Sequence, residues 1–287
     1  MLLRVAATCS LTRPLAAVPQ AQAERRERQR KEREEQPPAI GIEGTAEFYT
    51  RQLVVVDPES SAPVNWPKKL EFSDHVIGSY VKAVAAIEHP KHCPLRTIAA
   101  TPFPPTCAGP ANTEDAELKT HDLLIFPEQI RVHDVELSHI PSLVTELLQP
   151  NPDVTSILTG LNLRYKSLAE GFHILVCAHE SRDERCGCNG PKLLRWLQDV
   201  AHEKGVPLHL YSSSHFGGHR YAANCIAYPS GDWYGLLNEP KDAKALLDAL
   251  VDGEPLRLAT QWRGRIATKK DEQIRMLHEA VANKARR

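Results

Sequence analysis

The chain has 287 residues, of which 42% are hydrophobic and 25% are charged, and its formal net charge is −1. This composition is typical of a folded globular protein, and the length suffices for one large domain or two small ones. The near-zero net charge gives no electrostatic case for nucleic acid as a partner, and no apolar run is long enough to span a membrane.

The first 23 residues contain arginine, alanine and hydroxyl residues, and the first acidic residue is Glu24. This composition is typical of a transit peptide rather than a secretory signal. It predicts a mitochondrial matrix location, with a plastid or the cytoplasm as alternatives. A mixed-charge stretch without an apolar stripe follows at 24–38, so residues 1–45 are predicted to be a disordered leader and charged linker.

A first α/β domain is predicted at 46–150, followed by a linker at 151–167, because the sequence QPNPD breaks the chain at 149–153. Apolar periodicity predicts strands at 51–57 and 123–127, helices at 74–89 and 138–149, and a Pro-rich loop at 101–120.

A second domain is predicted at 168–254, with the element order β-α-β-β-β-α of a small thioredoxin-type α/β sandwich. Its predicted elements are strands at 172–178, 206–212, 224–229 and 233–237, and helices at 191–204 and 241–253. Gly190 and Pro191 are expected to open the first of these helices. Residues 255–287 are a tail whose amphipathic last part is predicted to cap the domain or to dock a partner.

Seven cysteines are a poor disulfide framework, because the number is odd and the spacing is wide. Three of them, Cys177, Cys186 and Cys188, lie within twelve residues of each other. This spacing indicates a metal site or a redox pair in a reducing compartment.

Four potential metal ligands follow two neighbouring strands. Cys177 ends one predicted strand, Cys186 lies before the next helix, and His215 and His219 flank Phe-Gly-Gly after the next strand. Adjacent parallel strands deliver their following loops to the same sheet edge, so these side chains can meet there. Two thiolates and two imidazoles form a ligand set for zinc or for an iron–sulfur cluster. The consecutive glycines indicate a loop, which excludes a helical zinc-protease motif.

Three stretches of the second half, CAHESRDERCGCNGP, SHFGGHRYAANCIAYPSGDWYG and QWRGR, resemble the sucrase/ferredoxin-like family. NWPKKLE and LLIFPEQI are similar to the N-terminal markers of that family, and the resemblance covers roughly residues 50–270. It implies a thioredoxin-like ferredoxin domain preceded by a degenerate thioredoxin-like domain. It also implies a [2Fe–2S] cluster held by Cys177, Cys186, His215 and His219. Ala223 stands where the family usually has glycine.

Imidazole ligands make such a cluster less negative than four thiolates do, which raises its reduction potential. Their second nitrogen can lose or gain a proton near neutral pH, so electron and proton transfer are expected to be coupled. The sequence therefore predicts a one-electron carrier, rather than a substrate-turning enzyme, with redox proteins as donor and acceptor. No catalytic residue is assigned, since neither a dinucleotide fingerprint nor a glycosidase carboxylate pair is present.

Two alternatives remain open: a structural Cys2His2 zinc module, and a thioredoxin-like dithiol oxidoreductase that uses Cys186 and Cys188. Several neighbouring side chains also have two readings. Arg182, Asp183 and Arg185 form either a salt-bridged loop or a support for the ligands. His179 is expected to be a loop donor. Trp262, Arg263 and Arg265 are expected to pack the tail or to contact a partner.

Overall fold

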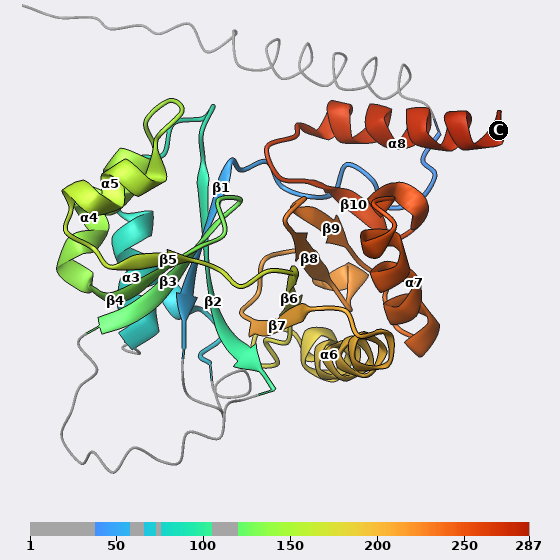
Figure 1. Cartoon of the computed structure of the whole chain (residues 1–287), viewed down its shortest axis with the longest axis horizontal. Helices are drawn as coiled ribbons and strands as arrows, with labels where there is room; N and C mark the ends of the chain where they lie inside the picture. Colours follow the sequence, from blue (N-terminus) through green and yellow to red (C-terminus); the bar gives the residue numbers. More distant parts are fainter. Residues whose placement is uncertain (1–37, 58–65, 73–75, 105–119, 287) are drawn as a thin grey trace, which may run out of the picture. The chain divides into compact units, whose positions relative to one another are not determined.

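The protein was analysed as a computed structural model, which describes residues 38–57, 66–72, 76–104 and 120–286 (Figure 1). Most of the predicted leader, up to residue 37, lies outside these ranges. In the described ranges, ten strands form one mixed sheet in the order β10-β9-β8-β6-β7-β2-β1-β3-β4-β5.

The first half of the sheet is built from a β-α-β-β-β unit and two further helices. Its elements are β1 (Arg51–Val56), α3 (Val76–Ala85), β2 (Leu95–Phe103), β3 (Thr120–Phe126), β4 (Ile130–Glu136), α4 (Ile140–Leu147), α5 (Val154–Gly160) and β5 (Tyr165–Ser167). β1 is parallel to β2 and antiparallel to β3, and β3 is antiparallel to β4. Residues of α3, α4 and α5 pack with β1 and β3 in one hydrophobic cluster.

The second half repeats this strand order. Its elements are β6 (Phe172–Cys177), α6 (Glu184–Lys204), β7 (Leu208–Ser213), β8 (Cys225–Tyr228), β9 (Asp232–Tyr234), α7 (Pro240–Val251), β10 (Trp262–Arg265) and α8 (Lys270–Ala285). β6 is parallel to β7 and antiparallel to β8, and β8 is antiparallel to β9. The order β9-β8-β6-β7 is that of a thioredoxin-like sheet, so the predicted α/β fold class is confirmed.

The two halves meet where β2 pairs with β7 in antiparallel fashion, with Ala100 opposite Ser213 and Phe103 opposite Leu210. A hydrophobic cluster spans this seam, and in it the rings of Phe126 and Tyr228 stack with centroids 3.9 Å apart. The halves therefore share one sheet and part of one core. Their predicted division into domains at 46–150 and 168–254 stays a prediction.

Segments that were expected to be irregular carry regular structure. The predicted linker at 151–167 contains α5 and β5, and β5 pairs with β4. The predicted loop at 101–120 includes the end of β2 and the start of β3, while residues 105–119 lie outside the described ranges. The tail supplies β10, which extends the sheet beside β9, before α8 begins.

The predicted start of α6 at Pro191 is wrong, because the helix begins at Glu184. Asp183 is its N-cap, and the Asp183 carboxylate accepts a hydrogen bond from the backbone N–H of Arg185 at 3.1 Å. This side-chain cap provides a helix start seven residues before Pro191. Cys186 consequently lies in the first turn of a helix and not in a loop.

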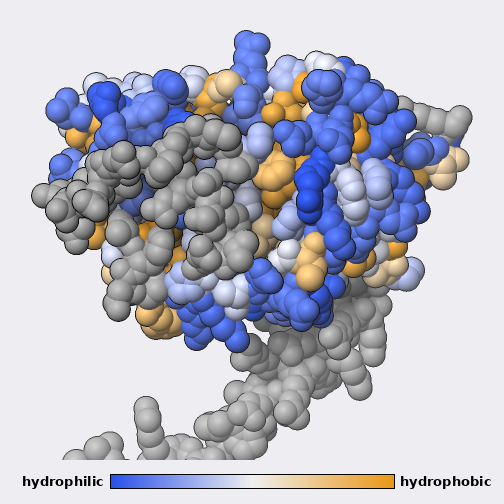
Figure 2. All heavy atoms as spheres, turned by 90° about the horizontal axis from the view of Figure 1, so that it is seen from below, coloured by the Kyte–Doolittle hydropathy of each residue, from blue (hydrophilic) through white to orange (hydrophobic). Residues whose placement is uncertain are grey.

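Hydrophilic residues predominate on the face drawn in Figure 2, where hydrophobic residues are scattered. This is the usual surface composition of folded domains. Among the helices in the described ranges, none has both the length and the apolar composition needed to cross a bilayer.

Candidate metal centre

The two cysteines meet where α6 packs on the end of β6. Cys177 is the last residue of β6 and is 1% exposed, and Cys186, in the first turn of α6, is fully buried. Gly190 allows the close approach, because a Cβ atom there would collide with the Cys177 carbonyl oxygen. A side chain at this position would push the helix, and Cys186 with it, away from Cys177.

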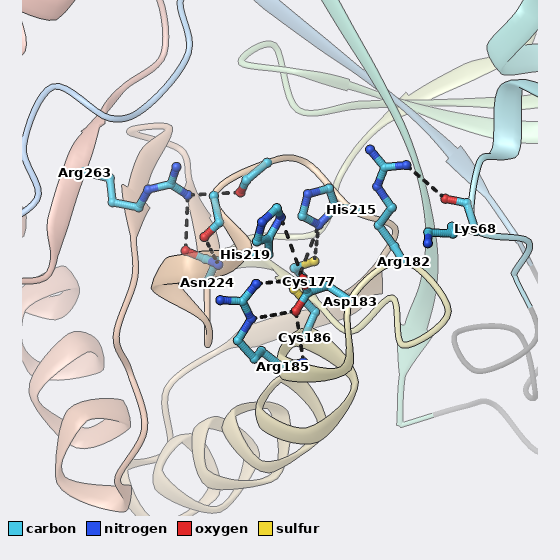
Figure 3. Close-up of polar contacts among 12 residues, drawn as sticks. Lys68, Cys177, Arg182, Asp183, Arg185, Cys186, His215, His219, Asn224 and Arg263 are labelled. Carbon is cyan, nitrogen blue, oxygen red and sulfur yellow. Dashed lines mark hydrogen bonds and ion pairs between the residues drawn. The ribbon is translucent and has the colours of Figure 1, made fainter.

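His215 completes a convergent group of three donors. Its Nδ1 atom lies 3.6 Å from the Cys177 sulfur and 3.9 Å from the Cys186 sulfur (Figure 3). Among the described residues, Cys177, Cys186 and His215 are the one group of three His, Cys, Asp or Glu side chains with all ligand atoms within 4.8 Å. β6 and β7 are parallel, so the segments that follow them lie at the same edge of the sheet and Cys177 and His215 meet there, as the sequence predicts.

His219 lies beside this group and faces outward. Its ring centroid is 5.4 Å from that of His215, and its side chain is 49% exposed. Its Nδ1 atom is 3.9 Å from a carboxylate oxygen of Asp183. The structure therefore brings three of the four predicted ligands together and places the fourth at the rim.

The two thiols interact directly. A hydrogen bond with the Cys186 thiol lowers the pKa of Cys177, whereas the same contact and burial raise the pKa of Cys186. Cys177 is the more acidic partner, and the pair holds one proton more firmly than two separate thiols would. A metal ion that binds here would have to displace that proton.

Cys188 is exposed and does not join the group. It lies two residues after Cys186 within α6. Side chains at this spacing point to different faces of a helix. The Cys186–Cys188 pair is therefore poorly placed to act as a dithiol.

His179 connects the ligand loops to the first half of the sheet. Its ring is 2% exposed, its Nε2–H donates to the Pro67 carbonyl oxygen at 3.1 Å, and its Nδ1 accepts from the His215 backbone N–H at 3.2 Å. These partners require the neutral tautomer with the proton on Nε2, and burial lowers the pKa of His179. His179 is a loop donor, as expected, but its contact with the His215 backbone could not be predicted.

The remaining polar residues of the loop make separate contacts. The Arg185 side chain donates two hydrogen bonds of 2.9 Å to the Asp183 carboxylate. This side-chain hydrogen bonding is the largest cause that lowers the pKa of Asp183 to about 2. Arg182 donates to the Lys68 carbonyl oxygen at 3.5 Å, and Ser181 donates to the Trp66 carbonyl oxygen. The loop before α6 is thus fixed to the segment that carries the NWPKKLE sequence.

Known proteins resemble this chain in both halves. The profile of the sucrase/ferredoxin-like family matches residues 42–264. The altered inheritance of mitochondria protein 32 of Meyerozyma guilliermondii is 36% identical over 98 residues, which are 32% of this chain and 34% of that protein. Its namesake in Clavispora lusitaniae is 27% identical over 182 residues, covering 57% of this chain and 66% of that protein. The chain therefore matches about a third to two thirds of the length of these relatives.

Among solved structures, a thioredoxin-like [2Fe–2S] ferredoxin from Aquifex aeolicus aligns with 34% of this chain and 94% of its own, at 19% identity and a TM-score of 0.28. The family profile, by contrast, extends from the segment before β1 to β10 and includes the Cys177, Cys186 and His215 group. The chain belongs to the sucrase/ferredoxin-like family.

Proposed function

We propose that this protein is a one-electron carrier that holds a [2Fe–2S] cluster through Cys177, Cys186, His215 and His219. The observation that carries the proposal is the convergence of two buried thiols on the Nδ1 atom of His215. When bound, such a cluster supplies a reversible one-electron couple. No further group is needed for that chemistry.

The donor chemistry fits the cluster. Mixed thiolate and imidazole coordination of a [2Fe–2S] centre is known from Rieske proteins. Cys177, Cys186 and His215 converge, and the ring centroid of His219 lies 5.4 Å from that of His215, which supports His219 as the fourth ligand. Because the His219 side chain is 49% exposed, we expect redox partner proteins to approach from its side. The names of the relatives in yeasts favour a mitochondrial location.

Zinc is the second candidate occupant, because two cysteines and two histidines also form a tetrahedral zinc site. The test is anaerobic purification followed by iron, sulfide and zinc analysis and a visible spectrum. We expect two irons and two sulfides per chain with a red-brown colour. One zinc and no colour, even after reconstitution with iron and sulfide, would show that the site is a structural zinc module.

The reduction potential should fall as pH rises, because an imidazole ligand loses its second proton more readily when the cluster is oxidised. The slope is expected to approach about 59 mV per pH unit where one proton accompanies one electron. Redox titration at several values between about pH 6 and 9 measures it. A potential that stays constant over this range would rule out the coupling while leaving the cluster in place.

Replacing His179 with alanine should lower the affinity for the metal about 10-fold to 100-fold, as is typical for residues that orient a ligand. The variant removes the acceptor for the His215 N–H and leaves the Pro67 carbonyl oxygen unpaired. Release of iron to a chelator measures the effect. His173→Ala is the matched control. His173 lies on β6 and is as buried as His179, but its ring forms hydrogen bonds with the Tyr211 hydroxyl and the Ala169 carbonyl oxygen. Equal iron release from both variants would mean that His179 has no specific role.

A further inference from the structure

The segment between the two histidines, here named the histidine loop (residues 215–219), rests on a buried arginine from β10. Arg263 Nη1 donates to the Gly217 carbonyl oxygen at 3.4 Å and to Asn224 Oδ1 at 3.2 Å. On its other side, Arg263 donates to the carbonyl oxygen and the hydroxyl of Thr45 at 3.0 and 3.2 Å. The guanidinium thus ties the histidine loop to the strand that ends the sheet (Figure 3).

Gly218 is the residue that lets the guanidinium lie so close. Its φ of +76° already favours glycine, and a Cβ atom would lie 2.6 Å from Cζ of Arg263. Asn224, which accepts from Arg263, also donates from Nδ2 to the Gly218 carbonyl oxygen at 3.0 Å. Two consecutive carbonyl groups of the histidine loop are therefore held, one by Arg263 and one by its partner Asn224.

The charge of Arg263 is buried, and among the described residues no carboxylate lies within ion-pair distance of it, although Glu47, the partner of Arg96, acts on it at longer range. The residue is 2% exposed, its four acceptors are uncharged oxygens, and it forms no ion pair within the part of the chain that the structure describes. Burial lowers its pKa to about 10, so it remains a cation at neutral pH. The rings of Tyr221 and Trp233, with centroids 5.2 and 5.1 Å away, offset part of the desolvation cost.

Two arginines near the site that are less buried than Arg263 pair with carboxylates. Arg96 pairs with Glu47 at 2.5 Å, and Arg185 pairs with Asp183 at 2.9 Å. Burying a cation without an ion-pair partner destabilises the folded state. The position of Arg263 beside the histidine loop therefore indicates a functional role that offsets this cost. Adding an electron to a nearby site makes that site more negative, and a fixed positive charge favours this state.

We propose that Arg263 is a positioning residue that holds the histidine loop in place for ligation, and that its buried positive charge favours the reduced state of the site. The second part rests on the proposed function, whereas the first concerns the protein chain alone. This assigns the QWRGR sequence of the tail to the metal centre.

The variants Arg263→Gln and Arg263→Lys separate the two parts, because lysine keeps the charge but cannot reproduce the four hydrogen bonds. Arg265→Lys is the matched control, since Arg265 lies on the same strand and binds Asp232 instead. In metal-free protein, hydrogen exchange of the Tyr221 and Ala222 amides, which bond to carbonyl oxygens of the loop, should accelerate about tenfold or more in both Arg263 variants but not in the control.

In protein that contains the cluster, Arg263→Gln should lower the equilibrium constant for reduction about tenfold, which is about 59 mV for a one-electron couple. Arg263→Lys should retain most of the wild-type potential. Unchanged amide exchange in both Arg263 variants overturns the positioning role, and equal potentials for glutamine and wild type overturn the charge role. If wild-type protein contains no iron even after reconstitution, the proposed function is overturned. Hydrogen exchange in the metal-free variants would still decide whether Arg263 positions the histidine loop.

Discussion

Replacing Cys177 and Cys186 together with serine should reduce bound metal to background, whereas Cys188→Ser should retain the wild-type metal content. The two buried sulfurs are the donors that approach His215, and Cys188 is exposed on another face of α6. A serine hydroxyl keeps its proton at neutral pH and does not replace a thiolate ligand. The loss should exceed the roughly 100-fold effect of residues that only orient a ligand.

The measurement is metal content per folded chain after reconstitution, with circular dichroism of the metal-free proteins as the control for folding. Both cysteines are buried, so some loss of stability is expected in addition to the loss of metal. If Cys188→Ser loses the metal to the same extent, the ligand set is wrong. If the double variant also keeps the metal, the convergent group is not the site.

The sequence predicts the convergence of Cys177 and His215 because their placement depends on only two strands, β6 and β7. β6 contains the apolar run Ile-Leu-Val, and β7 begins with alternating leucine residues. A helix connects the two strands, which makes them parallel. Parallel strands deliver Cys177 and His215 to one edge of the sheet whatever the rest of the chain does. The position of His219 relative to His215 depends on two positive-φ glycines, which the sequence pattern does not specify.

β2 could not be predicted, although it lies in the middle of the sheet. Its sequence LRTIAATPF contains small and hydroxyl residues and has neither the alternation nor the apolar run typical of a strand. Its partners decide its conformation: β1 pairs along one edge and β7 along the other. The pairing of β2 with β7 therefore depends on tertiary contacts and not on the local sequence of β2. The same holds for the contact between the first half and the loops that carry Cys177 and His215.

The start of α6 shows why local signals can mislead. Gly190 followed by Pro191 is a typical helix opening, yet both residues lie inside the helix. Gly190 is present because α6 approaches the Cys177 carbonyl group, a contact that exists only in the folded sheet. The glycine that indicates a helix boundary in the sequence is a packing residue of the candidate metal centre in the structure.

Replacing Gly190 with alanine should therefore destabilise the metal-free protein and lower its metal content. The new Cβ atom would collide with the Cys177 carbonyl oxygen and lie 3.0 Å from Cα of Ala178. Backbone atoms on β6 cannot move aside cheaply, and overpacking of this kind costs about 3 kcal/mol. Alanine is the better helix former by about 1 kcal/mol, so the two effects oppose each other and the steric cost dominates.

Gly160→Ala isolates the gain in helix propensity from the steric cost. Gly160 is also in a helix, α5, but nothing lies within 4 Å of its Cβ position. This variant should gain up to about 1 kcal/mol, whereas Gly190→Ala should lose about 2 kcal/mol net and lower Tm by about 4–8 °C. Thermal unfolding of both metal-free variants measures the difference. If Gly190→Ala is as stable as Gly160→Ala, α6 does not pack against Cys177 as closely as the structure shows, and the juxtaposition of Cys177 and Cys186 loses its structural basis.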